Sequence, residues 1–283
     1  MEEKKNISDI VLVALDGSAP SQAAARIGIQ VAKSLNLKIR GIFIVDESLV
    51  LDGYVNYQLE LGKSEVPTSQ AELVDWFEQK GNLELQWLQG LCQAAGVPVG
   101  TELLFGGIPE AILNETERAE MIALGRRGNQ HPDDPEHLGR NFKVIAHHTH
   151  CPLLIGGEEQ RKVGRMLLAY DGSSHAKNAL NWAARLQGVL AQETIVLAVD
   201  EGTGPLSQWI TGIDDDLKLS ALDNYRLEGR AGNPEEEIIS VAQTNQVDLI
   251  LMGEYSHAAI LEWLVGSKLD FVLHNTGIPV LVD

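Results

Sequence analysis

The chain contains the same structural unit twice. The segment Val-Ala-Leu-Asp-Gly-Ser at 13–18 is repeated as Leu-Ala-Tyr-Asp-Gly-Ser at 168–173, and each copy is followed by an Ala-rich stretch. An apolar run that stops at Asp-Gly-Ser predicts a strand, a turn and the N-cap of a helix, and it places a carboxylate at the edge where α/β sheets bind ligands. Because the whole unit is repeated, we expect two similar domains in one chain.

Three later landmarks of the repeat keep their order in both halves. The motif Gly-x-Pro-Glu occurs at 107–110 and again at 232–235. An apolar strand that ends in glycine follows at 121–125 and at 249–253. Each half closes with a strand that has proline near its start, at 151–155 and at 278–282. The polar stretch 156–162 predicts a linker, so we place the domains at 1–157 and 163–283. The second half is shorter between its second and third strands, and its second helix is expected to be short or missing.

Strand and helix patterns alternate along the first half. Apolar runs of strand length occur at 10–15, 38–45, 97–104 and 121–124, and helical spacing occurs at 21–35 and 72–95. The near-continuous apolar character of the strands favours a parallel sheet that is covered on both faces. The predicted fold class is therefore α/β, with a doubly wound parallel sheet flanked by helices in each half.

The composition argues against a membrane or nucleic-acid role. Hydrophobic residues make up 44% of the chain and charged residues 22%, and no apolar run is long enough to span a bilayer. The formal net charge of −18 repels anionic lipids and phosphate backbones. The first six residues hold no apolar signal region, and Cys92 and Cys151 lie far apart in sequence, so we expect a cytoplasmic protein.

Taken together, the four landmarks resemble the universal stress protein family, twice, over nearly the whole chain. The resemblance implies two Rossmann-like domains of the adenine-nucleotide α-hydrolase-like class, each with an open, mainly five-stranded parallel sheet. It implies that the two domains pair through their last strands as a pseudo-dimer. It also implies a stress-response role and, where a member has a cofactor, ATP with Mg²⁺.

The family's nucleotide signature is a glycine, two residues, a second glycine, nine residues, and a third glycine followed by serine or threonine. Glycines let backbone amides approach phosphates, and the hydroxyl adds a hydrogen bond at a helix N-terminus. The second half keeps this spacing with Gly253, Gly266 and Ser267, but Ser256 replaces the second glycine. The first half has ten residues in place of nine, three of them acidic, and Arg140 replaces the hydroxyl, either as a phosphate ligand or as a surface residue. The signature therefore favours the second half.

The residues expected to bind the nucleotide in the second half are Asp171, Gly172, Val199, Gly253, Ser256, Gly266 and Ser267. The less favoured counterparts in the first half are Asp16, Val45, Gly125, Gly128, Gly139 and Arg140. The resemblance implies that the two aspartates contact the adenosine part of the ligand. An aspartate before a helix is equally well explained as a helix cap, with the glycine allowing the turn, and Ser18 and Ser173 are expected to be caps.

Other polar clusters are interpreted as structural. His147 and His150, one turn apart on a predicted helix, and the neighbouring Cys151 lack the spacing of a known metal motif. The acidic run 214–216 is interpreted as a solvated loop, and the run 235–237 as the first turn of a helix. We therefore predict no metal site in the protein itself.

The sequence contains no recognisable catalytic constellation. It has no Gly-x-Ser-x-Gly elbow and no Walker loop, so we predict no catalytic residues, and a weak ATPase is the least supported function. The first hypothesis is a binding protein that ATP regulates, with an unknown protein partner. The alternative is a tandem scaffold that has lost both nucleotide sites and acts through protein or small-ligand contacts. Pairing of whole chains into a homodimer is left open beside the internal pairing of domains.

Overall fold

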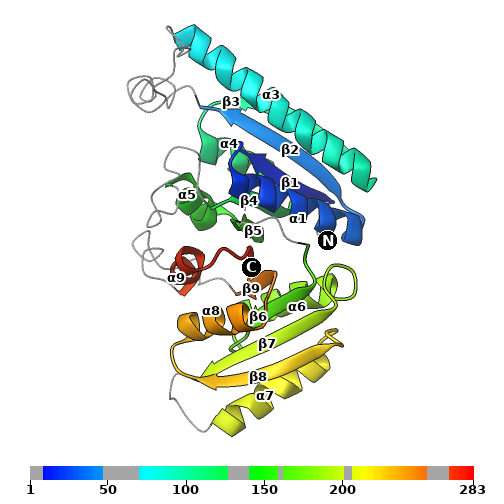
Figure 1. Cartoon of the computed structure of the whole chain (residues 1–283), viewed down its shortest axis with the longest axis vertical. Helices are drawn as coiled ribbons and strands as arrows, with labels where there is room; N and C mark the ends of the chain where they lie inside the picture. Colours follow the sequence, from blue (N-terminus) through cyan, green and yellow to red (C-terminus); the bar gives the residue numbers. More distant parts are fainter. Residues whose placement is uncertain (1–8, 47–69, 127–139, 159–161, 201–205, 254–267) are drawn as a thin grey trace, which may run out of the picture.

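The strands of both halves join in one ten-stranded sheet (Figure 1). The structure, a computed structural model, describes residues 9–46, 70–126, 140–158, 162–200, 206–253 and 268–283. The first half supplies β1 (Ile10–Leu15), β2 (Lys38–Val45), β3 (Val99–Phe105), β4 (Ala119–Gly125) and β5 (Leu153–Gly156). The second half supplies β6 (Arg165–Ala169), β7 (Glu193–Asp200), β8 (Tyr225–Ala231), β9 (Leu249–Met252) and β10 (Val280–Val282). The order across the sheet is β3-β2-β1-β4-β5-β10-β9-β6-β7-β8.

The last strands of the two halves form the junction, as predicted. Every pairing within a half is parallel, whereas β5 and β10 pair antiparallel with Leu154 opposite Leu281. The antiparallel junction reverses the strand direction between the halves. The carboxyl ends of the first five strands therefore lie at one edge of the sheet, and those of the second five lie at the opposite edge.

Helices cover both faces of the sheet, which confirms the doubly wound α/β fold. One face carries α1 (Ala19–Leu35), α3 (Gln70–Ala95), α6 (Ser174–Leu186) and α7 (Leu206–Leu219), whose buried residues share one core cluster. The other face carries α4 (Ile108–Glu115), α5 (Arg140–His148), α8 (Pro234–Thr244) and α9 (Lys268–Asn275), which share a second cluster. A short 3₁₀ helix, Thr116–Arg118, precedes β4.

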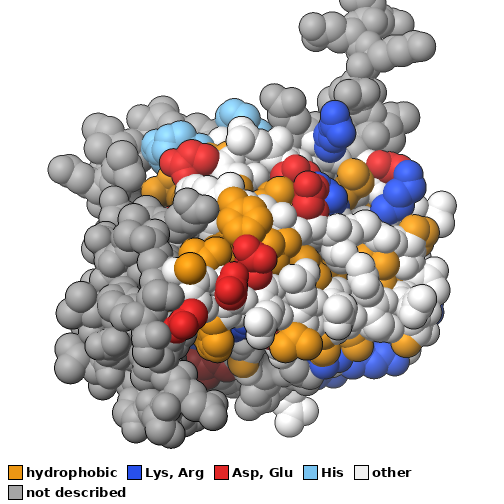
Figure 2. All heavy atoms as spheres, turned by 90° about the horizontal axis from the view of Figure 1, so that it is seen from above, with side chains coloured by type: hydrophobic (Ala, Val, Ile, Leu, Met, Phe, Trp, Pro, Cys, Tyr) orange, Lys and Arg blue, Asp and Glu red, His pale blue; other side chains and the backbone are white. Residues whose placement is uncertain are grey.

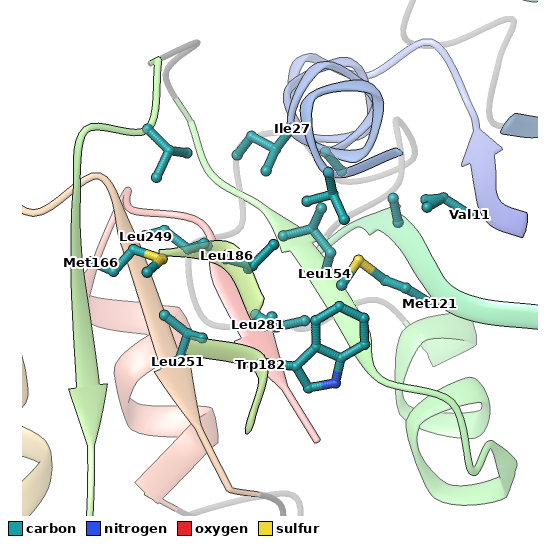
Figure 3. Close-up of a cluster of buried hydrophobic side chains, with 14 of the residues drawn as sticks. Val11, Ile27, Met121, Leu154, Met166, Trp182, Leu186, Leu249, Leu251 and Leu281 are labelled. Atoms are coloured by element: carbon teal, nitrogen blue, oxygen red, sulfur yellow. The ribbon is translucent and has the colours of Figure 1, made fainter. Parts of the chain in front are cut away.

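The hydrophobic core runs across the junction without a break between the halves. Figure 3 shows Leu154 of β5 and Leu281 of β10 among buried side chains from both halves, including Met121 and Trp182. Leu154 and Leu281 are almost completely buried. Because both core clusters contain residues of both halves, burial of apolar surface holds the two domains together.

The region after β7 differs from the sequence prediction. A regular helix of 14 residues, α7, stands where a short or missing helix was expected, and it contains the acidic run that was interpreted as a loop. Asp214 and Asp215 form ion pairs with Lys218 one turn later, at 2.5 and 3.8 Å, while Asp216 faces Tyr170 and Lys177. These ion pairs support the helical conformation and explain why the acidic run is not a loop.

The histidine cluster also differs from the prediction. Helix α5 ends at His148, so His150 lies beyond it and does not share a helix face with His147. The ring Nδ1 of His148 lies 2.8 Å from the carbonyl oxygen of Val144. In the part of the chain that the structure describes, no group of three His, Cys, Asp or Glu side chains could hold a metal ion.

Acidic, basic and hydrophobic side chains are mixed on the face seen from above (Figure 2). Trp76, Leu83 and Phe105 are among the large hydrophobic residues that are partly exposed. No helix among the described residues has the length and apolar character needed to cross a membrane.

Candidate functional site

The two Asp-Gly-Ser turns have the same local structure. Gly17 and Gly172 both adopt a φ of 79°, a conformation that favours glycine because it has no Cβ. Oδ1 of Asp16 accepts a hydrogen bond from the N–H two residues later at 2.8 Å, and Oδ1 of Asp171 does the same at 2.9 Å. One carboxylate oxygen of each aspartate therefore stabilises its turn, whereas the caps of the helices are Ser18 and Ser173.

The serine of each turn caps the following helix, which confirms the prediction for both. Ser18 Oγ accepts from the N–H of Ser21 at 3.2 Å, and Ser173 Oγ accepts from the N–H of Ala176 at 3.1 Å. Each hydroxyl satisfies one of the N–H groups that a helix start leaves without a partner. The two turns therefore begin with equal backbone geometry, and any difference between them must come from what surrounds them.

Helix α3 covers the turn of the first half. A Cβ atom added to Gly17 would lie 2.7 Å from Lys80 Cε and 3.2 Å from Glu84 Oε1. Glu84 is held in place by Gln22 of α1, whose Nε2 donates to its carboxylate at 3.0 and 3.3 Å. A lysine, a glutamate and a glutamine thus fill the space above the first turn.

Lys80 is enclosed in this cluster. Burial lowers the pKa of its ammonium group, and the carboxylates of Asp16 and Glu84 act in the opposite direction. Its Nζ also lies 5.8 Å from the centre of the Trp76 ring, within reach of a cation–π interaction. The side chain of Lys80 therefore supplies the first turn with a positive charge from within the chain.

Among the described residues, no side chain covers the turn of the second half. Asp171 is exposed, and no atom of the described residues would lie within 4 Å of a Cβ added to Gly172. Helix α7 follows β7 as α3 follows β2, but it has 14 residues against 26 (Figure 1). In this region α7 contacts Tyr170, the residue before Asp171. Its Asp216 accepts a hydrogen bond from the hydroxyl of the buried Tyr170 at 3.0 Å, and burial raises the pKa of that hydroxyl.

The glycines at the ends of β4 and β9 are required by packing. A Cβ added to Gly253 would lie 2.5 Å from the carbonyl carbon of His175 and 2.6 Å from the nitrogen of Ala176 at the start of α6. The corresponding contact of Gly125, with the nitrogen of Ser21 in α1, is 3.0 Å. Both glycines bring a strand end close to a helix start, with or without a ligand.

The remaining signature residues lie outside the described residues, with one exception. Those outside are Gly128 and Gly139 in the first half and Ser256, Gly266 and Ser267 in the second. Arg140 is the first residue of α5, and Lys268, which follows Ser267, is the first residue of α9. The described part of the site in the second half is therefore Asp171, Gly172, Val199 and Gly253.

Val45 and Val199 do not occupy equivalent positions. Ala14, two residues before Asp16, pairs with Ile42, and Ala169, two residues before Asp171, pairs with Leu197. Counted from these pairs, Val199 corresponds to Ile44, and Val45 corresponds to Asp200. Successive residues of a strand face opposite sides, and Val45 indeed packs in one core cluster while Val199 and Ile44 contact the other.

Side chains of both halves meet near the carboxyl end of β10. Trp182 Nε1 donates to Asp283 Oδ2 at 2.7 Å, and Arg185 pairs with Glu120 of the first half at 2.7 Å. Burial is the largest cause of the raised pKa of the Asp283 carboxyl, and Glu120 adds to it. This edge of the second half is thus in contact with the amino ends of the strands of the first half.

A hollow that the described residues form does not coincide with the candidate site. A cavity of about 820 Å³ lies at the amino ends of β6 and β9, beside the linker. It is lined by Glu158, Gly164, Arg165, Ala242, Gln243, Gln246, Val247, Asp248, Thr276, Gly277 and Ile278. In doubly wound sheets ligands bind at the carboxyl ends of the strands, so we place the candidate site at Asp171 and not in this cavity.

Lys80 and Glu84 lie beside the candidate site of the first half, and the sequence analysis did not identify them. They lie four residues apart on α3, a spacing that marks a shared helix face but not what that face covers. Only the packing of α3 on the sheet shows that this face lies over Gly17.

Comparisons with known proteins agree with this architecture. The model of the universal stress protein family matches residues 8–155 and again residues 162–283. Universal stress protein Slr1230 of Synechocystis sp. is 27% identical over 288 residues, which cover 96% of this chain and 98% of that protein. The crystal structure of a universal stress protein from Archaeoglobus fulgidus matches this chain with a TM-score of 0.73 at 19% sequence identity. The match covers 97% of this chain and 96% of that protein. A structure from Pseudomonas aeruginosa has a TM-score of 0.64 at 15% identity, covering 98% and 94%. At these identities the structural matches show the fold alone.

Proposed function

The chain belongs to the universal stress protein family, and from this premise we propose that it binds one ATP, with Mg²⁺, in its second half. The bound nucleotide shifts the conformation of the chain, and a protein partner responds to that state. The domains that carry this function are 1–157 and 163–283, with the nucleotide in the later one. The family name supports a role in the stress response.

The observation that carries the proposal is the difference between the two turns. Asp171 is exposed, and no described residue covers Gly172 beside it, so its carboxylate is accessible to the hydroxyls of a ribose. Lys80 and Glu84 lie against Gly17, next to Asp16, so we expect an adenosine at this turn to displace both side chains. A single accessible turn supports one nucleotide per chain.

The phosphates would lie toward the start of α9. Gly253 ends β9 against the start of α6, and Lys268 begins α9 directly after Gly266 and Ser267. The start of a helix and a lysine side chain both attract an anion. Because the chain as a whole has a net charge of −18 and repels anions, binding of a phosphate requires such a local positive group. Arg140 at the start of α5 is the corresponding charge in the first half.

Binding without catalysis is the function that these groups support. The described part of the site offers a carboxylate, backbone groups and an apolar side chain, Val199, and these groups bind and orient a nucleotide. The alternative is a scaffold that binds no nucleotide, and the serine at 256 in place of the second glycine favours it. In that case the shared sheet would present its surface to a protein or a small ligand.

Calorimetric titration with ATP and Mg²⁺ distinguishes the two functions, combined with mass spectrometry of nucleotide released from the purified, denatured protein. We expect a stoichiometry of one per chain. Asp171→Ala is expected to weaken binding on the order of tenfold, because a hydrogen bond to a charged group is lost. Asp16→Ala is the matched control, since it removes the same turn contact, and its ATP affinity is expected to be unchanged.

Three results would contradict the proposal. Absence of both heat and released nucleotide would leave the scaffold as the function. Equal losses of affinity in Asp16→Ala and Asp171→Ala would mean that the two turns do not differ as their surroundings indicate. Unchanged affinity in Gly266→Asp would place the phosphates elsewhere.

A further inference from the structure

Arg126 is a buried arginine of the first half that contacts a helix of the second half. It follows β4 directly, and only 3% of its side chain is exposed. Its Nη1 donates to the carbonyl oxygens of Leu273 at 2.8 Å and Thr276 at 2.5 Å, and its Nη2 pairs with Glu158. A buried charge is retained only where such partners satisfy it, so this contact fixes the guanidinium in one place.

The two carbonyls belong to the end of α9. Leu273 lies in the last turn of α9 (Lys268–Asn275), and Thr276 follows the helix. The last carbonyls of a helix have no partner within the helix, and the negative end of its dipole favours a cation. Arg126 therefore acts as a C-terminal cap for α9, supplied by the other half of the chain.

The start of the same helix belongs to the proposed nucleotide site. Lys268 follows Gly266 and Ser267 in the sequence, and Leu269, Val272 and Leu273 pack the helix into the core. A short helix that is fixed at its end and along its buried side cannot shift its start independently. Arg126 thus helps to hold Lys268, the described residue at the start of α9.

We propose that Arg126 is a positioning residue for nucleotide binding: from the first half it fixes α9, and through α9 it fixes Lys268, the residue that begins this helix in the second half. The proposal rests on the proposed function. Arg126 also links α9 to Glu158 at the start of the linker.

The test compares ATP with adenosine, because adenosine has no phosphates. Arg126→Gln is expected to weaken ATP binding on the order of tenfold and to leave adenosine binding unchanged. Arg126→Lys, which keeps the charge and part of the donor set, is expected to recover part of the loss. The matched control is Arg165→Gln, since Arg165 also donates to a carbonyl at a helix end, that of Asn245 after α8, and should leave both affinities unchanged.

Hydrogen exchange of α9 without ligand separates this proposal from the proposed function. Faster exchange across 269–275 in Arg126→Gln, but not in Arg165→Gln, would support the capping of α9 even if the unsubstituted chain bound no ATP. Failure of the unsubstituted chain to bind ATP would overturn the proposed function and the nucleotide role of Arg126 together. ATP binding that is unchanged in Arg126→Gln, or ATP and adenosine binding that weaken equally, would overturn the inference alone. If Arg126→Gln fails to fold, the same comparisons are made with Arg126→Lys.

Discussion

Replacing each turn glycine with alanine tests whether α3 covers one turn and leaves the other open. Gly17 and Gly172 share a φ of 79°, so alanine carries the same backbone cost at both positions, about 1–2 kcal/mol. Only at Gly17 does the new Cβ meet other side chains, 2.7 Å from Lys80 Cε and 3.2 Å from Glu84 Oε1. The flexible end of Lys80 can move, so we place the additional cost at the low end for overpacking, about 1 kcal/mol.

The expected losses of unfolding free energy are therefore roughly 2–3 kcal/mol for Gly17→Ala and roughly 1–2 kcal/mol for Gly172→Ala. Lys80→Ala removes the atom that the new Cβ meets. In a double-mutant cycle we expect a coupling of about 1 kcal/mol between Gly17→Ala and Lys80→Ala, and none between Gly172→Ala and Lys80→Ala.

Urea unfolding followed by circular dichroism measures these differences, provided that the denaturant slope is the same for all variants. The second cycle is the control, because it contains the same lysine substitution and the same backbone strain. Equal losses at the two glycines, or equal couplings in the two cycles, would refute the view that α3 closes the first turn. The surroundings of the two turns would then give no reason to expect a single nucleotide per chain.

Three further predictions concern the core and its titratable groups. Leu154→Ala removes a fully buried side chain beside Leu281 at the junction, so it should lower the free energy of unfolding by roughly 2–5 kcal/mol. Because the junction belongs to both halves, calorimetry should show a lower unfolding temperature for both halves together. Burial raises the pKa of the Cys92 thiol to about 11, so about one molecule in a thousand carries the thiolate at pH 8, and Cys92 should react with a disulfide reagent only after unfolding. The pKa of the Asp283 carboxyl is raised in the folded state, so the folded state binds this proton more tightly than the unfolded chain does. The protonated carboxyl therefore stabilises the fold at low pH, and this stabilisation is lost as the pH rises through the folded pKa. As the pH rises above about 4, the ordinary pKa of an aspartate, the protein should therefore lose stability relative to Asp283→Asn in urea titrations, and a difference that stays constant with pH would contradict this.

The strand predictions were accurate where an apolar run alone decides the structure. The first two strands, β1 and β2, have the predicted bounds, 10–15 and 38–45. The third begins at Val99 and not at 97, because the N–H of Val97 donates to the carbonyl of Cys92 and closes the end of α3 around Gly96 at positive φ. Local hydrogen bonding of this kind competes with the strand in a way that hydrophobicity does not reveal.

The difference between the two turns could not be predicted from the turns themselves. The Asp-Gly-Ser motif specifies the aspartate contact, the positive φ and the serine cap, and both copies have all three. What covers Gly17 is a helix more than fifty positions later in the chain, whose orientation depends on its packing on β2 and β3. The mismatch between Val45 and Val199 has a similar cause, since a shift of one residue along a strand moves a side chain to the other face.

Opposite strand directions in the two halves limit how the halves can influence each other. The antiparallel pairing of β5 with β10 places the Asp16 and Asp171 turns at opposite edges of the sheet, so no single ligand can reach both. Any effect of one half on the other has to pass through the packed junction, where Leu154 and Leu281 meet, or through the contacts beside it. Among these contacts, Arg126 reaches from the strand end of the first half to the helix that begins at the proposed phosphate site. In the proposed function, the first half therefore contributes to binding although Lys80 and Glu84 lie over its own turn, because it supplies the cation that contacts the end of α9.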